Sequence, residues 1–368
     1  MRWLILFVLF VVGVGASILL SGHIPKPQTA QVPAAQAPQT APSPPSTTSL
    51  DSTTLQTVFV PVWQLDGRDI SFPDVGFSSG APQRMVYFGI AVNEDGVDTQ
   101  EQGYQNLSLF TEKAPSNVQK YLAVRMTDQK ANAAILANTE SYDKIVEDVV
   151  STTKKRGFEG IVVDLEFSPT LNEKLPAQIN SFIEKFYTAA HRENMKLAIT
   201  VYGDTFYRRR PYDIAYLDSV TDEMMIMAYD MHKAGGEPGP NFPLRGRSEF
   251  GYDMETLAAD FAGVSAAKLT IIYGMYGYDW IVDEKQRPIK PAESVTLAQI
   301  QKKFIEPCAK INCVSTRDKL AEETQIEFVD RAVYHVVWFE DMQSVQAKAQ
   351  FWRSKGVGSV AFWAYGYF

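Results

Sequence analysis

The hydrophobic positions of this chain follow two alternating patterns along most of its length. Eight short apolar runs have the length and composition of buried strands, and most are separated by stretches with helical spacing. The runs are residues 58–63, 85–92, 121–126, 160–166, 197–202, 224–229, 269–275 and 359–363. The clearest helical stretches are residues 143–155, 179–191 and 343–354. Strands that alternate with helices predict a parallel sheet, and eight of them fit one α/β domain, a (β/α)8 TIM barrel over residues 56–368.

Two segments depart from this repeating pattern. Residues 64–83 show no helical spacing, so the first crossover is expected to lack a helix. Residues 276–340 form a long insertion between the seventh and eighth strands. Its pattern predicts a helix near residues 296–305 and a hairpin that ends at residues 333–339. We therefore expect a small α+β insertion within the barrel.

The N-terminal segment of the sequence predicts that the protein is exported. After Arg2, residues 3–20 carry no charge and are almost wholly apolar, which is near the lower length limit for a membrane-spanning helix. We expect residues 1–22 to form a single-pass anchor in the cell membrane, with Arg2 inside and the barrel extracytoplasmic. The alternative is a cleaved signal peptide and a secreted protein, because Val14-Gly15-Ala16 resembles a cleavage site. Residues 23–55, rich in Pro, Ala, Gln, Ser and Thr, predict a disordered linker.

Composition excludes several functional classes. A net charge of -8 without a basic run argues against a nucleic-acid partner. Four histidines without H-x-x-x-H spacing and two cysteines are too few for a zinc or cysteine metal site, so no metal or cofactor is expected. Cys308 and Cys313 lie five residues apart in the exported insertion, and we expect them to form a local disulfide.

The fourth predicted strand carries the most informative polar residues. Because side chains alternate along a strand, Asp164 and Glu166 share one face with Val162, and the intervening aliphatic residues share the other. The aliphatic face suits the outer helices, so both carboxylates would reach the C-terminal end of the barrel interior, where active sites of this architecture lie. Two such acids separate in pKa, as acid catalysis at a glycosidic bond requires. From spacing alone, two idle carboxylates at a solvated strand end are an equal alternative.

This strand resembles the signature of glycoside hydrolase family 18, Asp-Gly-x-Asp-x-Asp-x-Glu. Asp164 and Glu166 match its last two acids, whereas Glu159 and Val162 stand where the family has its other aspartates. We expect Val162 to point into the barrel, one layer below Asp164, among neighbours adapted to an apolar residue.

Three further segments carry the same resemblance in the expected order. Residues 227–230, Met-Ala-Tyr-Asp, resemble the family's sixth-strand Met-x-Tyr-Asp, and Trp363 stands near the end of the last strand, where the family keeps a tryptophan. Residues 276–280 and 337–341 resemble the branch that acts on peptidoglycan and spore cortex. The third strand, residues 121–126, lacks the Ser-x-Gly-Gly of many chitinases, which argues against chitin itself.

The resemblance implies a role for each matching residue. Glu166 would be the acid and then the base, Asp164 would orient the 2-acetamido group of the sugar, and Tyr229 would hydrogen-bond to it. The residues expected to contact the substrate are Asp230, Trp363, Tyr276 and Trp280, with packing of the insertion as the alternative for Trp280.

The function implied is hydrolysis of β-1,4-linked N-acetylglucosamine-containing glycans, peptidoglycan or chitin-like, by substrate-assisted retaining catalysis. The expected partners are that glycan and, through the N-terminal helix, the membrane. The alternatives are a catalytically silent, lectin-like barrel and a docking factor in envelope assembly or sporulation. Barrels of this family that became lectins lose the glutamate, so its presence at Glu166 favours an enzyme.

Overall fold

Eight parallel strands close into a barrel in the computed structural model, which describes residues 50, 54–65, 82–170 and 172–368. Their order around the barrel is β1-β15-β9-β8-β7-β6-β5-β2. The strands are β1 (Leu55–Pro61), β2 (Arg84–Ile90), β5 (Gln119–Met126), β6 (Gly160–Leu165), β7 (Lys196–Tyr202), β8 (Glu223–Ala228), β9 (Leu269–Gly274) and β15 (Ser359–Trp363). The predicted (β/α)8 barrel is confirmed, and each strand overlaps one of the eight predicted runs.

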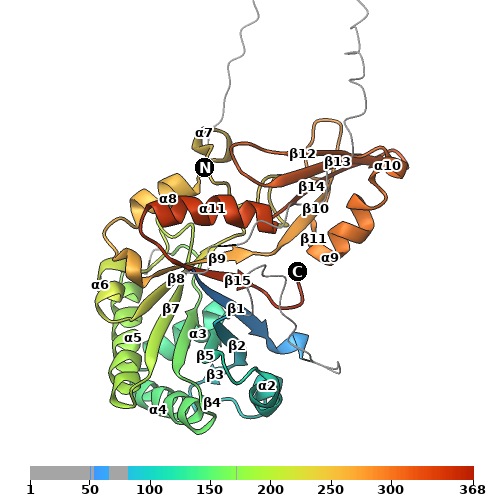
Figure 1. Cartoon of the computed structure of the whole chain (residues 1–368). Coiled ribbons are helices and arrows are strands. Elements are labelled where there is room, and N and C mark those ends of the chain that lie inside the picture. Colours follow the sequence, from blue (N-terminus) through green and yellow to red (C-terminus); the bar gives the residue numbers. More distant parts are fainter. Residues whose placement is uncertain (1–49, 51–53, 66–81, 171) are drawn as a thin grey trace, which may run out of the picture. The chain divides into compact units, whose positions relative to one another are not determined.

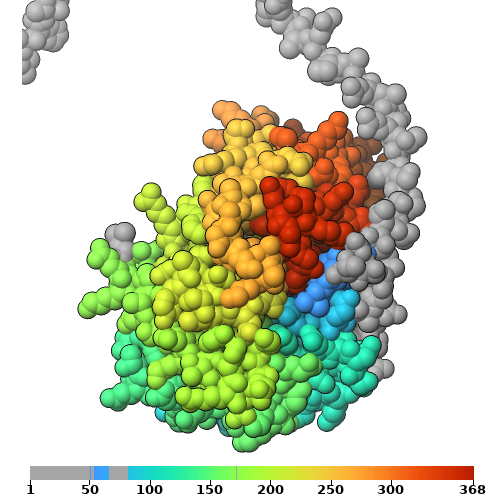
Figure 2. Space-filling view, turned by 60° about the vertical axis from the view of Figure 1, so that its left-hand side comes forward, coloured from blue at the N-terminus to red at the C-terminus, as the bar shows by residue number. Residues whose placement is uncertain are grey.

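The first and last strands of the chain close the barrel. Leu55 to Val58 of β1 pair with Ser359 to Phe362 of β15, and the other edge of β1 pairs with β2. Figure 2 shows this closure at the surface, where the blue N-terminal segment lies between the red C-terminal segment and the cyan residues that follow β2. Closure leaves no unpaired edge in the barrel sheet.

Helices cover the outside of the barrel, and Figure 1 shows α5 and α6 along the outer side of β7 and β8. The three longest are α4 (Glu140–Lys155), α5 (Leu175–Arg192) and α11 (Met342–Ser354), which contain the predicted helical stretches. Their apolar residues recur three and four positions apart and are buried against the outer face of the strands. The shorter helices are α1 (Gln102–Gln105), α2 (Leu107–Lys113), α3 (Gln129–Ala137), α6 (Ile214–Ser219), α7 (Arg247–Phe250) and α8 (Met254–Asp260).

The barrel interior contains an apolar cluster separate from the core beneath the helices. Val162 is fully buried there and lies in register with Ala123 of β5 and Ala198 of β7. Ile161 and Val163 belong instead to the core beneath the outer helices. The alternation predicted for this strand is therefore confirmed, and Asp164 is the next interior position above Val162.

The insertion between β9 and β15 is a five-stranded antiparallel sheet with the order β11-β10-β14-β13-β12. Its strands are β10 (Tyr276–Val282), β11 (Glu293–Thr296), β12 (Val314–Arg317), β13 (Thr324–Asp330) and β14 (Val333–Phe339). Hairpin β13–β14 and the helical segments α9 (Leu297–Ile300) and η3 (Gln301–Ile305) match the prediction, whereas the sequence pattern did not reveal the other three strands. Cys308 and Cys313, at the two sides of α10 (Cys308–Ile311), form a disulfide.

The predicted membrane anchor, almost all of the predicted linker and most of the first crossover lie outside the described residues. Within the part of the chain that the structure describes, no helix combines the length and the apolar character needed to cross a bilayer.

Candidate active site

Asp164 and Glu166 lie at the C-terminal mouth of the barrel, at the end of β6. Asp164 is 2% exposed and Glu166 is half-buried. The backbone N–H of Glu166 donates to the carbonyl of Met126 at 2.9 Å, which extends the pairing of β6 with β5 by one residue. Both carboxyl groups line a cavity of about 270 Å³. The aromatic residues of its wall are Phe59, Trp63, Phe88, Tyr229, Tyr276 and Trp363.

Strand β7 supplies one hydroxyl donor to each of these acids. The hydroxyl of Thr200 donates to Oδ1 of Asp164, and the hydroxyl of Tyr202 donates to Oε2 of Glu166. Thr200 and Tyr202 are two residues apart, so they point to the same side of β7, just as the two acids do on β6. The partners that fix both carboxyl groups are therefore neutral hydroxyls rather than cations.

Burial raises the proton affinity of both Asp164 and Glu166. Burial and the neighbouring Glu166 carboxylate raise the pKa of Asp164 to about 7, against the hydrogen bond from Thr200 and the charge of Arg125. Burial also raises the pKa of Glu166, opposed by the hydrogen bond from Tyr202 and the charge of Arg210. The pair can therefore hold a proton close to neutral pH, which is what a general acid needs.

Asp230 is the third carboxylate of the cavity, in the loop after β8. It adopts a left-handed backbone conformation with a φ of 58°, which aspartate tolerates better than most residues. Its backbone N–H donates to Oδ1 of Asn241 at 2.8 Å. Its Oδ1 accepts hydrogen bonds from the hydroxyls of Tyr276 and Tyr278, the second at 2.8 Å. Sequence reasoning missed Asn241, which carries no motif, and Tyr278, although Tyr278 lies inside the recognised segment 276–280.

A fully buried group of charges supports the Asn241 loop from behind. Glu323 accepts from the backbone N–H of Asn241 at 2.6 Å and from that of Phe242 at 2.8 Å. The Nζ atom of Lys348 in α11 lies 2.6 Å from carboxylate oxygens of both Glu323 and Glu340, and all three side chains are 0% exposed. The insertion is thus tied through these charges to the loop that carries Asp230. Sequence reasoning missed this support, because its members lie far apart in the chain.

Trp363 forms part of the aromatic wall of the cavity. Its ring lies 4.8 Å from that of Phe88, edge to face, and 6.4 Å from that of Tyr229 at an interplanar angle of 20°. Tyr276 and Trp363 also line an adjoining cavity of about 290 Å³ on the side of the insertion. The two cavities share these rings, so the aromatic surface continues from the acids toward β10 and β11.

The structure brings six of the seven predicted site residues to one cavity. They are Asp164, Glu166, Tyr229, Asp230, Tyr276 and Trp363. Trp280 does not lie there. Its side chain is fully buried in the insertion among Val336 and Trp338, and its Nε1 donates to the carbonyl of Gly236 at 3.0 Å. This burial supports the alternative stated for Trp280, packing of the insertion.

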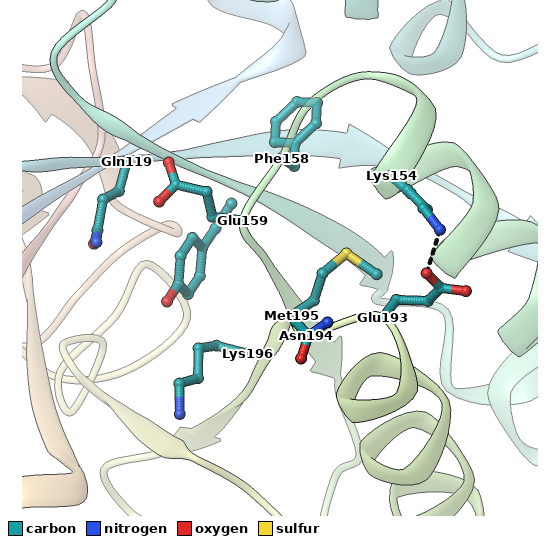
Figure 3. Close-up of a pocket in the computed structure, with 9 residues that line it drawn as sticks. Gln119, Lys154, Phe158, Glu159, Glu193, Asn194, Met195 and Lys196 are labelled. Carbon is teal, nitrogen blue, oxygen red and sulfur yellow. Dashed lines mark hydrogen bonds and ion pairs between the residues drawn. The ribbon is translucent and has the colours of Figure 1, made fainter.

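A larger cavity of about 380 Å³ lies at the opposite end of the barrel, where β5, β6 and β7 begin. Its charged lining residues are exposed, and Lys154 pairs with Glu193 (Figure 3). Glu159 at this end is likewise exposed. The carboxylates of this cavity are exposed to solvent, whereas the acids of the C-terminal mouth are buried or half-buried, so the chemistry points to the mouth. Among the described residues, no group of three or more His, Cys, Asp or Glu side chains is placed to hold a metal ion.

Residues 85–367 match the sequence profile of the Glycosyl hydrolases family 18. A protein named as a sporulation-specific glycosylase from Bacillus subtilis is 27% identical over 62% of this chain and 52% of its own length. The cortical fragment-lytic enzyme of Bacillus anthracis is 23% identical over 77% of this chain and 64% of its own length. The chain thus spans between half and two thirds of the length of these relatives.

The fold also resembles a solved structure, the spore cortex-lytic enzyme SleL of Bacillus cereus. The TM-score is 0.68 at 19% identity, over 86% of this chain and 71% of that one. At this level of identity the likeness concerns the fold alone.

Proposed function

The chain belongs to glycosyl hydrolase family 18 and is a glycosidase, and from this premise we propose that it cleaves β-1,4-linked N-acetylglucosamine-containing glycans, with peptidoglycan as the substrate class. The observation that carries the proposal is the pair Asp164 and Glu166, buried together in an aromatic-walled cavity with raised pKa values. Aromatic walls suit sugar rings, since their faces pack against C–H groups.

Glu166 is the proposed acid and base. It protonates the oxygen of the leaving sugar as the glycosidic bond breaks, and it later takes a proton from the attacking water. The hydrogen bond from Tyr202 to Oε2 fixes the orientation of its carboxyl group. Partial burial keeps the proton on Glu166 until a substrate oxygen can accept it.

The proposed nucleophile is the 2-acetamido oxygen of the substrate, which attacks the anomeric carbon and forms an oxazolinium ion. Asp164, held by Thr200, accepts a hydrogen bond from the acetamido N–H and balances the positive charge of the intermediate. The hydroxyl of Tyr229 bonds to the same acetamido group. Asp230 and Trp363 bind the rest of that sugar, the first through hydrogen bonds and the second as the floor beneath the ring.

Peptidoglycan is favoured over chitin by the relatives that the chain matches. Two of them are named for sporulation or for lysis of spore cortex fragments. A mouse chitotriosidase, 25% identical over 71% of this chain and 60% of its own length, supports the chitin-like alternative. The N-terminal sequence supports a further proposal, that residues 1–22 anchor the chain in the cell membrane and residues 23–55 hold the barrel outside it, with secretion as the alternative.

The experiment that tests this proposal offers the purified full chain two substrates, peptidoglycan and chito-oligosaccharides, and identifies the products by mass. We expect fragments with a reducing N-acetylglucosamine end from peptidoglycan, and none from the Glu166→Gln variant. A lectin-like or docking barrel would bind glycan and leave it intact in both proteins. Efficient cleavage of fully deacetylated glycan would contradict the acetamido nucleophile.

A further inference from the structure

Arg125 is a cation in the wall of the proposed catalytic cavity with no role in the chemistry described above. It lies on β5, in register with Asp164 of β6, and shares the interior face of the strand with Ala123. Its side chain lines the cavity together with those of Trp63 and Phe88. Arg125 therefore points toward the space that a sugar would occupy, beside the acid pair.

The guanidinium of Arg125 has few polar partners for a group in the wall of a cavity. Its ion pair is with Glu101, at 3.5 Å between nitrogen and oxygen, and the two side chains are 26% and 42% exposed. Its Nε atom is buried and has no hydrogen-bond partner among the described residues. An ion pair this long and this solvated contributes little, and a buried donor without a partner costs free energy.

In two other arginines of the barrel, each of the three guanidinium nitrogens has a partner within the protein. Arg84 donates to both oxygens of Glu223 at 2.6 Å and to Thr57 at 2.9 Å. Arg210 bonds to Asp204 through two nitrogens and to a backbone carbonyl through the third. Arg125 differs from both, because its side chain lines a cavity and its buried Nε atom has no hydrogen-bond partner among the described residues. This pattern is typical of a group whose partner is a ligand.

We propose that Arg125 binds a carboxylate on the glycan, so that the enzyme selects acidic amino sugars, such as N-acetylmuramic acid with a free 3-O-lactyl carboxylate. The proposal rests on the proposed function, since it names the substrate class of the same site. A planar guanidinium can hold a carboxylate through two parallel N–H donors, which gives both affinity and orientation. In intact peptidoglycan that carboxyl carries the stem peptide as an amide, so the reaction class that supplies this substrate is amide hydrolysis.

The charges around the cavity permit an anion to enter. The pair of Asp164 and Glu166 holds a proton near neutral pH, because burial raises the pKa of both groups, so the pair carries less than its full negative charge. Lys233, an exposed residue of the loop after β8, is a second cation, and its charge lowers the pKa of Glu166. The mouth therefore presents positive groups on both sides of the acid pair. The rival role for Arg125 is to position Asp164 by its charge alone.

The experiment compares two substrates that differ only in the anion. One is a glycan of alternating N-acetylglucosamine and N-acetylmuramic acid with free lactyl carboxylates, and the other is the same glycan with those carboxylates converted to methyl amides. For the unmodified enzyme we expect kcat/KM to favour the carboxylate at least tenfold. In Arg125→Gln that ratio should fall to within twofold of one, and Arg125→Lys should retain part of it. A positioning role would lower kcat/KM for both substrates by the same factor and leave the ratio unchanged, which would overturn the proposal.

A binding measurement separates this inference from the proposed function. In the Glu166→Gln background, calorimetry with the same two glycans reports the preference for the anion even if neither glycan is turned over. Equal affinity for both would refute the role of Arg125, whereas a preference in this background, together with no turnover by the unmodified enzyme, would refute the hydrolase and keep the role. Arg331→Gln, whose side chain is 93% exposed in the β13–β14 turn, is the matched control and should keep the full preference.

Discussion

The two ends of the barrel both bury acidic side chains, but they surround them differently. At the N-terminal end, Glu223 accepts two hydrogen bonds from Arg84, and the guanidinium also lies over the ring of Tyr121, 4.7 Å from its centroid. At the C-terminal mouth, Asp164 and Glu166 are held by hydroxyls alone. The strands at both ends belong to the same sheet, so the difference lies in the partners and not in the fold.

The consequence of this difference is electrostatic. The carboxylate of Glu223 is paired with a guanidinium, so removing either partner would leave the other as an unpaired group in a largely buried place. A buried carboxylate whose hydrogen-bond partners are hydroxyls and whose neighbour is a second carboxylate gains proton affinity instead. One end of the barrel thus contributes to stability, while the other keeps a proton available for transfer. Each of the following predictions tests that division.

The largest expected effect is on turnover at the mouth. Glu166→Gln keeps the shape and the hydrogen bond from Tyr202 but cannot transfer a proton, so kcat should fall by about 10²–10⁴. The melting temperature should change little, since a half-buried residue beyond the end of β6 supports little packing. The matched control is Glu159→Gln at the opposite end of the same strand, which should retain full turnover. Turnover of Glu166→Gln within threefold of the unmodified enzyme would remove Glu166 as the acid.

The next effect is on stability at the opposite end. Glu223→Gln leaves Arg84 charged and almost buried, with its side chain only 3% exposed, and breaking such a pair costs about 3–5 kcal/mol. Urea unfolding should show this loss, while turnover per folded molecule stays within threefold. The double variant Arg84→Met, Glu223→Leu should recover much of the stability, since no unpaired charge remains. If Glu223→Gln were as stable as the unmodified protein, the ion pair between Arg84 and Glu223 would not be needed for stability at this end of the barrel.

The mouth should also make folding stability depend on pH. Burial and the Glu166 charge raise the pKa of Asp164 to about 7 in the folded protein, above its ordinary value of 3.8. Between these values the folded state binds more protons than the unfolded state, so stability is full below about pH 4 and falls as the pH rises toward 7. The loss is at most about 1.4 kcal/mol per pH unit. In Asp164→Asn this part of the slope should vanish, and melting curves at pH 4 to 8 for both proteins check it. Parallel pH profiles for the two would contradict the raised pKa.

The strands and the position of the acid pair could be predicted because both follow from local periodicity. The eight apolar runs mark the barrel, and a two-residue period puts Asp164 and Glu166 on the same face as Val162. Three strands of the insertion were missed, among them β11 and β12, which are four residues each and mostly exposed. Such short strands show no clear alternation, so their pairing depends on neighbours distant in the sequence.

The support of the site could not be predicted for a related reason. Asn241 holds the backbone of Asp230 and is itself held by Glu323, which pairs with Lys348. The contact between Asn241 and Glu323 joins residues 82 positions apart, and a lone polar residue in a loop carries no pattern. Trp280 shows the opposite case: it shares a face of β10 with Tyr276 and Tyr278, but it lies further along the strand, where its ring is buried in the core of the insertion. The motifs predicted which segments contain the candidate site residues, whereas contacts between distant segments determined which of their side chains reach the cavity.

The smallest expected effect concerns Val162, the interior residue between the two ends of the barrel. It is fully buried and lies beside Ala123 and Ala198, so the layer beneath Asp164 is apolar. A carboxyl group at this position would lose its hydration next to another acid, and burying an unpaired polar group costs about 1–3 kcal/mol. Val162→Asp should therefore lower the melting temperature without raising turnover, and Val162→Asn should be destabilised in the same way without adding a charge. The rival view is a decayed enzyme that lacks a useful carboxylate at this layer. A tenfold gain in glycan turnover by Val162→Asp at unchanged stability would establish that view. The side chains that take part in the chemistry would then extend one layer further into the barrel.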